Sequence, residues 1–356
     1  MNKINRVFLF VSDASTLLGV SKYNPQNCFE RLFKKYDYQT IETIKVESVK
    51  TIETTVKQKE TLNVKKEDLK QKLEDKKITK RQFDMENYKI EQENDKLEQK
   101  IIDTQECVDL LTLNKKQYVE KKIGKENIEM INAAKNISEK TEKTKAVKDK
   151  LVADANLSKE TIDLVAKEIK NMINTEHGIE RESNAIETFE KLEGVKLNTA
   201  QEFFKCHICT IDNTEYYLGG KLDGIHPDYI VEIKNRTKQF FYKVRDYEMI
   251  QIQLYMHILN YNKAKLVERL NQKMRINEVD RDDKLIEKTL TKLKIFCKLF
   301  DDFLKNNQKK TEYYKSSFTD KENFIYINFY LKIESEYQNL MEVDDDDDDV
   351  SCCISY

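Results

Sequence analysis

Apolar residues gather in two parts of the chain, which are separated by a long polar stretch. The first part, residues 1–40, begins with the β-type run 7–11, after which Ser12 or Asp13 is expected to cap a helix carrying Leu17 and Leu18. The triplet Tyr-Asn-Pro at 23–25 is typical of a turn, and an aromatic helix is predicted over about 28–36. This short segment is therefore predicted to be folded.

Residues 41–155 are rich in Lys, Glu, Gln, Asn and Thr, with only scattered aliphatic residues. Apolar positions separated by four, seven, three and seven residues predict one face of a long helix, and Leu69 and Leu73 indicate an earlier one. The stripe consists of Leu97, Ile101, Val108, Leu111 and Tyr118. We expect a long helical, coiled-coil-like insertion, or a helical hairpin, with a break near Gly124. The plainer alternative is a solvated arm with no role in chemistry.

From residue 156 onward, the hydrophobic period changes from helical to strand-like and back. Two helices are expected over 158–192, divided at Gly178, and then strands over 202–208, 216–218 and 229–234. A helix over about 246–261, helices near 262–274 and 280–306, and an apolar run at 324–331 that fits either a strand or a helix complete the pattern. This order predicts an α+β fold with a mixed or antiparallel central sheet flanked by helices.

Composition and charge narrow the class of protein only a little. The 356 residues carry a formal net charge of −2, and the aspartate run 344–349 inflates the negative side, so global charge does not decide for or against nucleic acid. Residues 342–356 are expected to be a disordered acidic tail. Seven irregularly spaced cysteines indicate a reducing compartment, and the sequence shows neither a signal peptide nor an apolar segment of membrane-spanning length. We therefore expect a soluble intracellular protein.

Three charged residues near the centre of the second part suggest chemistry. Glu232 and Lys234 are two apart on a predicted strand, so they point to the same face, and Asp223 ends the preceding strand beside Gly224. The missing side chain of Gly224 would leave room for a phosphate. Two carboxylates and one ammonium would then converge, as metal-assisted phosphodiester hydrolysis requires.

A plainer interpretation is an exposed strand with a Glu–Lys pair beside an Asp-Gly turn. The rest of that strand is apolar, with Ile230, Val231 and Ile233, so the fold is expected to bury it. Charged groups on a buried strand need a partner or a metal ion. This favours a functional site over a solvated pair.

Further motifs appear in order on both sides of these residues. They are the run 177–185 with Glu182, the Leu-Asp-Gly at 222–224, the Val-Glu-Ile-Lys at 231–234, and the Gln-x-Gln-x-x-Met at 251–256. Together they resemble the YqaJ-type viral recombinase nucleases, which are relatives of phage lambda exonuclease in the PD-(D/E)XK superfamily. The run 11–15 also resembles the opening Ser-Ala-Ser motif of that family, one residue longer. The resemblance covers roughly 1–36 and 170–262.

The resemblance implies roles for individual residues. Glu182, Asp223 and Glu232 would be Mg²⁺ ligands, together with the main-chain carbonyl of Val231 or Ile233, and Mn²⁺ would substitute. Lys234 and Gln253 would act beside them in catalysis, Gln253 by positioning water, with Gln251 as its neighbour. The terminal phosphate or the DNA would be held by Ser15, with Ser12 behind it and Arg6 and Gln251 as further candidates.

The chain also departs from the family pattern. Leu222 stands where the family usually has proline, His177 replaces a frequent tryptophan, and the insertion 41–155 is foreign to the compact family core. None of these departures removes a predicted metal ligand. The resemblance thus implies a restriction-endonuclease-like core, discontinuous over 1–40 and 156–335.

The function expected from the sequence is a Mg²⁺-dependent deoxyribonuclease, an exonuclease of viral DNA recombination or repair. The alternatives are a structure-specific endonuclease with the same metal site, and a non-catalytic protein that binds DNA or a partner. DNA is the expected partner, with a homo-oligomer or a single-strand annealing protein in addition. A viral protein of this kind would work in the host cytoplasm or nucleus, or in the virion.

Overall fold

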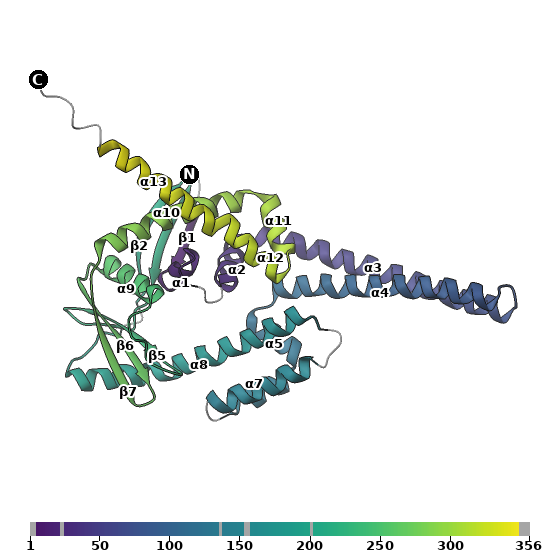
Figure 1. Ribbon diagram of the computed structural model, residues 1–356, viewed down its shortest axis with the longest axis horizontal. Coiled ribbons are helices and arrows are strands. Elements are labelled where there is room, and N and C mark those ends of the chain that lie inside the picture. Colours follow the sequence, from purple (N-terminus) through teal and green to yellow (C-terminus); the bar gives the residue numbers. More distant parts are fainter. Residues whose placement is uncertain (1–4, 22–24, 135–136, 153–156, 200–201, 349–356) are drawn as a thin grey trace, which may run out of the picture.

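Two small β-sheets lie among long helices in the computed structural model, which describes residues 5–21, 25–134, 137–152, 157–199 and 202–348 (Figure 1). The first sheet has the strand order β1-β3-β2, and the second has the order β4-β5-β6-β7. The strands are β1 (Asn5–Phe10), β2 (Phe204–Ile211), β3 (Thr214–Gly220), β4 (Gly224–Ile225), β5 (Ile230–Asn235), β6 (Lys263–Leu270) and β7 (Lys273–Asp280).

Both sheets are mixed. β1 runs parallel to β3, with Val7 beside Tyr216, whereas β2 pairs antiparallel with β3. In the second sheet β5 and β6 are parallel, and the outer pairs are antiparallel. Parallel neighbours need a crossover connection, which here is the helix α9 (Asp246–Leu259). The expected α+β mixture and the helix near 246–261 are confirmed, but the strands form two sheets instead of one antiparallel group.

The helix expected near 262–274 is wrong, because β6 and β7 form a hairpin there. Asn271 makes the turn with a positive φ of 57°, a conformation that asparagine tolerates better than most residues. Lysine, leucine and arginine in this segment favour a helix locally. Pairing of β6 with the buried strand β5 outweighs that preference.

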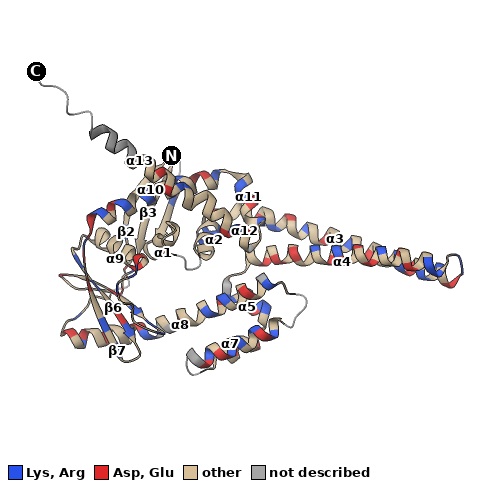
Figure 2. Ribbon diagram, viewed as in Figure 1, with Lys and Arg blue, Asp and Glu red and all other residues tan. Residues whose placement is uncertain are grey.

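Residues 41–155 divide into an arm and a smaller helical cluster. The arm consists of α3 (Tyr38–Glu74) and α4 (Lys80–Thr112), which lie side by side and project from the rest of the molecule (Figure 1). Lys59 pairs with Glu98, Asn63 with Asn94, and Lys66 with Glu91. Partners on α4 step backward as those on α3 step forward, so this part is an antiparallel helical hairpin. Charges of both signs alternate along its surface (Figure 2).

The helical cluster does not end where the sequence suggested. Its helices are α5 (Lys115–Ile123), α6 (Lys125–Asn132), α7 (Ile137–Val152) and the first half of α8 (Lys159–Glu193). Val119, Val147 and Val165 belong to one buried group that joins these helices. The second half of α8 instead packs against the second sheet, with Ala185 and Phe189 against Val231. One helix therefore spans both regions.

α8 is continuous through Gly178, where the sequence predicted a division between two helices. A glycine inside a helix costs about 1 kcal/mol relative to alanine, which weakens a helix without ending it. The Asn235 side chain donates a hydrogen bond to the Gly178 carbonyl (3.2 Å), so this turn of α8 is tied to the end of β5. Gly124, in contrast, does separate two helices, as expected, because α5 ends and α6 begins at it.

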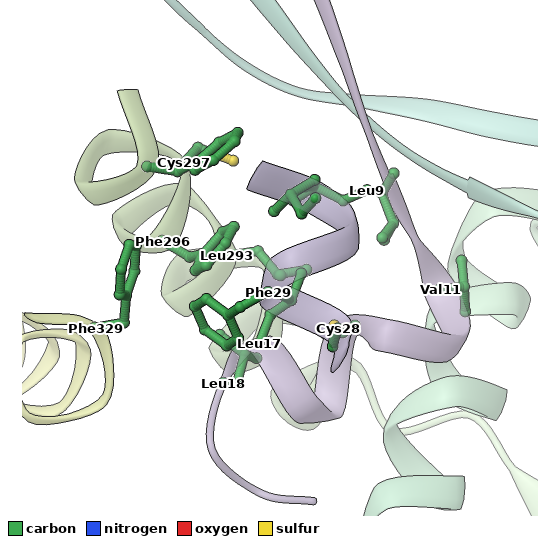
Figure 3. Close-up of a cluster of buried hydrophobic side chains, with 14 of the residues drawn as sticks. Leu9, Val11, Leu17, Leu18, Cys28, Phe29, Leu293, Phe296, Cys297 and Phe329 are labelled. Atoms are coloured by element: carbon green, nitrogen blue, oxygen red, sulfur yellow. The ribbon is translucent and has the colours of Figure 1, made fainter. Parts of the chain in front are cut away.

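The main core joins the start of the chain to its last third. It involves α1 (Val11–Leu17), α2 (Pro25–Tyr36), α9, α10 (Asp283–Lys305) and the helices that follow α10, as the close-up in Figure 3 shows for α1, α2 and α10. Those that follow are α11 (Asn307–Lys315), α12 (Phe318–Ile325), the π-helical turn η1 (Tyr326–Tyr330) and α13 (Leu331–Asp348). The helices expected over 28–36 and 280–306 are thus confirmed, and the run 324–331 is helical.

Three smaller expectations are also decided. α1 begins at Val11, with Phe10 at its N-cap and no side-chain cap, so neither Ser12 nor Asp13 caps it. The predicted turn at 23–25 lies largely outside the described residues.

The acidic end of the chain differs from the expectation. α13 is helical as far as Asp348, which contradicts a tail without regular structure from residue 342, whereas 349–356 are not described. Within the described part of the chain, no helix has the length and apolar character needed to cross a membrane.

Phe29 tests whether the two ends of the chain form one core. Its ring is fully buried and packs against Phe33, Phe296, Phe329 and Tyr330. We expect Phe29→Ala to lower the free energy of unfolding by about 3–5 kcal/mol, because it removes these contacts and leaves a cavity. Urea denaturation would measure the change. Val46→Ala on the exposed face of the arm is the control, for which a change within about 0.5 kcal/mol is expected. Equal effects of the two variants would contradict this account of the core.

Candidate active site

Asp223 lies at the edge of the second sheet, directly before the edge strand β4. Ile233 on β5 donates its main-chain N–H to Asp223 Oδ2 (2.6 Å), which holds the carboxylate against the neighbouring strand. The segment before it is also fixed, because the Tyr255 hydroxyl on α9 donates to the Lys221 carbonyl (2.6 Å). A Cβ atom on Gly220 would lie 2.5 Å from that hydroxyl, so only glycine leaves room for it.

Gly224 has a different role from the one expected. A Cβ atom there would lie 2.6 Å from Leu197 Cδ1, so the space beside Gly224 is filled by a buried leucine and not left for a phosphate. Leu197 belongs to the apolar group that joins α8 to β5. Gly224 therefore permits the packing of the sheet beneath Asp223.

Glu232 and Lys234 lie side by side on one face of β5, as their spacing predicted. Lys234 Nζ donates to Glu232 Oε1 at 2.6 Å, although only 6% of Glu232 is exposed. Val231 and Ile233 point to the other face, where they pack against α8. The strand therefore separates an apolar face from a charged one.

Gln251 on α9 completes this cluster. Its Nε2 donates to Glu232 Oε1 (2.8 Å), and its Oε1 accepts from Lys234 Nζ (3.2 Å). One amide thus satisfies a carboxylate and an ammonium at the same time. We refer to Asp223, Glu232, Lys234 and Gln251 as the β5 cluster.

Electrostatics within the β5 cluster are strongly coupled. Burial raises the pKa of Asp223, and the nearby charge of Glu232 raises it further, to about 8, despite the Ile233 hydrogen bond and the Lys234 charge. Burial alone would lower the pKa of Lys234, but the carboxylates of Glu232, Asp223 and Glu248 outweigh burial and raise it. Lys234 is thus held as a cation beside two carboxyl groups, one of which is disposed to keep its proton.

The donor set fits a hard divalent cation. Asp223, whose pKa is raised by its burial and by the neighbouring charge of Glu232, would ionise readily if a divalent cation entered the site. Mg²⁺ is commonly held by one or two protein carboxylates, with water and substrate phosphate completing its coordination. Asp223 and Glu232 would be those ligands.

Glu182 is less closely associated with Asp223 and Glu232 than the sequence predicted. Its charge contributes to the raised pKa of Asp223, so it lies on the same side of the molecule. Among the described residues, however, no group of three or more His, Cys, Asp or Glu side chains is arranged to hold a metal ion. The structure therefore brings together two of the three predicted carboxylate ligands.

Gln253 lies apart from the β5 cluster. Its Nε2 donates to the Asp280 carbonyl, and its Oε1 accepts from the Asp282 main-chain N–H, both at 2.8 Å. Residues two apart on a helix point in nearly opposite directions, so only one of Gln251 and Gln253 can face β5. The structure gives that contact to Gln251 and uses Gln253 to join α9 to the turn before α10.

The candidates for phosphate binding in the N-terminal segment are not gathered at one point. Ser15 is buried in α1 and Ser12 is exposed. Arg6 Nε pairs with Glu215 Oε2 (3.0 Å) across β1 and β3. No contact between these three residues and the β5 cluster is found in the described structure, so their role remains a prediction.

A second buried charge network continues from the β5 cluster, and the sequence analysis missed it. Arg236 makes a two-pronged ion pair with Glu248 on α9 (2.7 and 3.0 Å), and its Nε donates to Glu268 on β6 (2.7 Å). Both carboxylates are 1% exposed. The signal was present, because Arg236 directly follows β5 and continues the alternation of Glu232 and Lys234.

Comparisons with known proteins add little to this geometry. No family model and no curated protein matches the chain. Among solved structures, an alkaline exonuclease from Laribacter hongkongensis is similar at 14% identity and a TM-score of 0.32, over 55% of this chain and 97% of the enzyme. The same enzyme in complex with dAMP is similar at 14% identity and a TM-score of 0.31, over 55% of this chain and 97% of the enzyme. A phage-related exonuclease from Haemophilus somnus is similar at 16% identity and a TM-score of 0.27, over 46% of this chain and 85% of that protein. At such scores the likeness carries no argument about fold or activity.

The raised pKa of Asp223 predicts how stability depends on pH. In the unfolded chain this carboxyl would titrate near pH 4, so between about pH 4 and 8 the folded state holds a proton that the unfolded state releases. Its contribution to stability is therefore complete below about pH 4 and is lost as the pH rises through about 8. Asp223→Asn cannot ionise, so without divalent ions its melting temperature should increasingly exceed that of the wild type as pH rises. Thermal denaturation over a range of pH would measure this. A difference in melting temperature that is the same at every pH would contradict the raised pKa of Asp223.

Proposed function

We propose that this chain is a divalent-cation-dependent nuclease that hydrolyses phosphodiester bonds of DNA. The observation that carries the proposal is the β5 cluster, where two carboxyl groups and one ammonium meet on a strand whose opposite face is buried. Most Glu–Lys pairs are solvated and have little effect on stability. A pair with a buried carboxylate, beside a second carboxyl group with a raised pKa, is typical of a functional site.

Each residue of the cluster has a distinct task in this proposal. Mg²⁺ bound by Asp223 and Glu232 would lower the pKa of a coordinated water and offset negative charge on the phosphate. Lys234 places a permanent positive charge where negative charge develops on the phosphate, and it can donate a hydrogen bond to the attacking water. Gln251 fixes both the carboxylate of Glu232 and the ammonium of Lys234, so their positions do not depend on the substrate.

The finer assignment follows the sequence resemblance. We propose an exonuclease that acts in viral DNA recombination or repair, with DNA as its partner. Glu182 on α8 is a candidate third ligand, because it lies close enough to affect the pKa of Asp223. Residues Ser12, Ser15 and Arg6 remain candidates for the terminal phosphate.

Removal of a metal-binding carboxylate tests the proposal directly. We expect Asp223→Asn and Glu232→Gln each to lower the rate of Mg²⁺-dependent degradation of linear duplex DNA at least 100-fold, since metal catalysis supplies several kcal/mol and each 1.4 kcal/mol is about tenfold. Release of nucleotides from end-labelled DNA would measure this rate. Glu202→Gln, at an exposed position before β2, is the matched control and should leave it unchanged. A wild-type protein without activity, or carboxylate variants with full activity, would refute the proposal.

Closed circular DNA distinguishes exonuclease from endonuclease. An exonuclease leaves the circle intact, whereas a structure-specific endonuclease with the same metal site cuts it. A protein that binds DNA but degrades neither form would be the non-catalytic alternative.

The two glutamines of α9 give a paired prediction. We expect Gln251→Ala to lower kcat by about tenfold or more, because Lys234 and Glu232 lose their shared positioning amide. Its loss of stability should be smaller than that of Gln253→Ala, because Lys234 and Glu232 still partner each other. Gln253→Ala should instead lower stability by about 1–3 kcal/mol, because α9 loses two hydrogen bonds to the turn before α10, each worth about 0.5–1.5 kcal/mol, while kcat per folded molecule is retained. Measurement of kcat and urea denaturation on both variants tests the assignment. The reverse pattern would restore Gln253 to the catalytic role.

A further inference from the structure

The connection between β5 and α9 presents an aromatic residue to solvent. Tyr242 in this connection, residues 236–245, is 99% exposed, the highest value among the exposed large hydrophobic residues. An aromatic ring buries 150–250 Å² when it is packed, so full exposure forgoes a large gain in stability. A ring exposed in this way is free to stack on a ligand.

The main chain beside Tyr242 is firmly held. Arg275 on β7 donates to the Phe241 carbonyl (2.5 Å) and to the Tyr242 carbonyl (3.0 Å). The Phe241 ring lies under two guanidinium groups, with Arg236 at 4.5 Å and Arg245 at 4.0 Å from its centroid. Tyr242 is thus exposed on a fixed support, which is how a preorganised binding residue is presented.

Three cationic residues lie close to Tyr242 along this connection. Lys238, Lys243 and Arg245 are exposed, and none of them forms an ion pair in the part of the chain that the structure describes. Exposed cations beside an exposed aromatic side chain are typical of single-stranded nucleic-acid binding, in which cations track phosphates and a base stacks on the ring.

The support of Tyr242 is continuous with the β5 cluster. Arg236, which lies over the Phe241 ring, is held by Glu248 on α9, the helix that also carries Gln251 of the β5 cluster. Arg236 directly follows β5, and its main-chain N–H still bonds to the Arg269 carbonyl on β6. The exposed ring therefore belongs to the same rigid assembly as the residues that would act on the phosphate.

We propose that Tyr242 is a stacking platform for an unpaired base of the substrate strand, with Lys238, Lys243 and Arg245 contacting its phosphates. This inference rests on the proposed nuclease function and narrows it to strands that have an unpaired base near the cut. Bases inside a duplex are already stacked on their neighbours, so a single residue on a rigid support can engage only a base that has left the helix. The substrate class is therefore single-stranded DNA, or a duplex with a frayed or single-stranded end.

The test uses the full chain with Asp223→Asn, so that bound DNA is not degraded. Oligonucleotides carrying the fluorescent base 2-aminopurine at either end are titrated with the protein in Mg²⁺. We expect stacking to quench the fluorescence, Tyr242→Ala to abolish the quenching and to weaken single-strand binding about tenfold or more, and Tyr242→Phe to retain both. Affinity for a blunt, closed duplex should change less than about twofold.

A matched control is Tyr88→Ala on α4, which removes another exposed tyrosine far along the chain and should leave quenching and affinity unchanged. Quenching that persists in Tyr242→Ala, or an equal loss of duplex and single-strand binding, would overturn the stacking role. Cleavage by the chain with Asp223 intact is measured separately. Tyr242-dependent quenching without any cleavage would refute the nuclease proposal alone, and cleavage without Tyr242 dependence would refute the stacking proposal alone.

Discussion

Buried charge on β5 is the constraint around which the second sheet and α9 are organised. Glu232 and Lys234 share one face of a strand whose other face packs against α8, and Arg236 follows directly after its end. An ionised group in such a place must find a partner. The partners are Gln251 and Glu248 on α9 and Glu268 on β6. These contacts fix how α9 lies across the sheet, because a rotated helix would leave the charges unmatched. The same contacts hold the β5 cluster in place and support the loop that exposes Tyr242.

The long insertion does not disturb this arrangement. β1, from the start of the chain, pairs with β3, and the ion pair between Arg6 and Glu215 joins residues 209 positions apart. Phe29 and its neighbours then bury the N-terminal helices against α10 and η1. The arm projects from this core, and α8 connects the helical cluster to the sheet through one continuous helix (Figure 1). The insertion 41–155 therefore extends outward from the core and does not separate the N-terminal segment from the rest of it.

Much of the candidate site could be predicted from the sequence, because it depends on strand periodicity. Alternation over 229–234 placed Glu232 and Lys234 on one face, and the short connection brought Asp223 beside them. The choice between Gln251 and Gln253 could not be predicted, since both fit a motif and only the rotation of α9 decides which one faces β5. Arg236 was overlooked although it continues the same alternation. The distance of Glu182 from the carboxylates depends on how α8 crosses the sheet, which spacing does not contain.

The sequence by itself determined which segments are strands and helices wherever the hydrophobic period was strong, as in β5, α9 and α10, because side-chain direction follows directly from backbone period. Only the tertiary structure decided the rest. The β6–β7 hairpin exists because pairing with β5 outweighs a local helical preference, and α8 runs through Gly178 because each half has its own apolar surface to bury. A local pattern states which face of an element is apolar, whereas the partner that covers that face is chosen by packing of the whole chain.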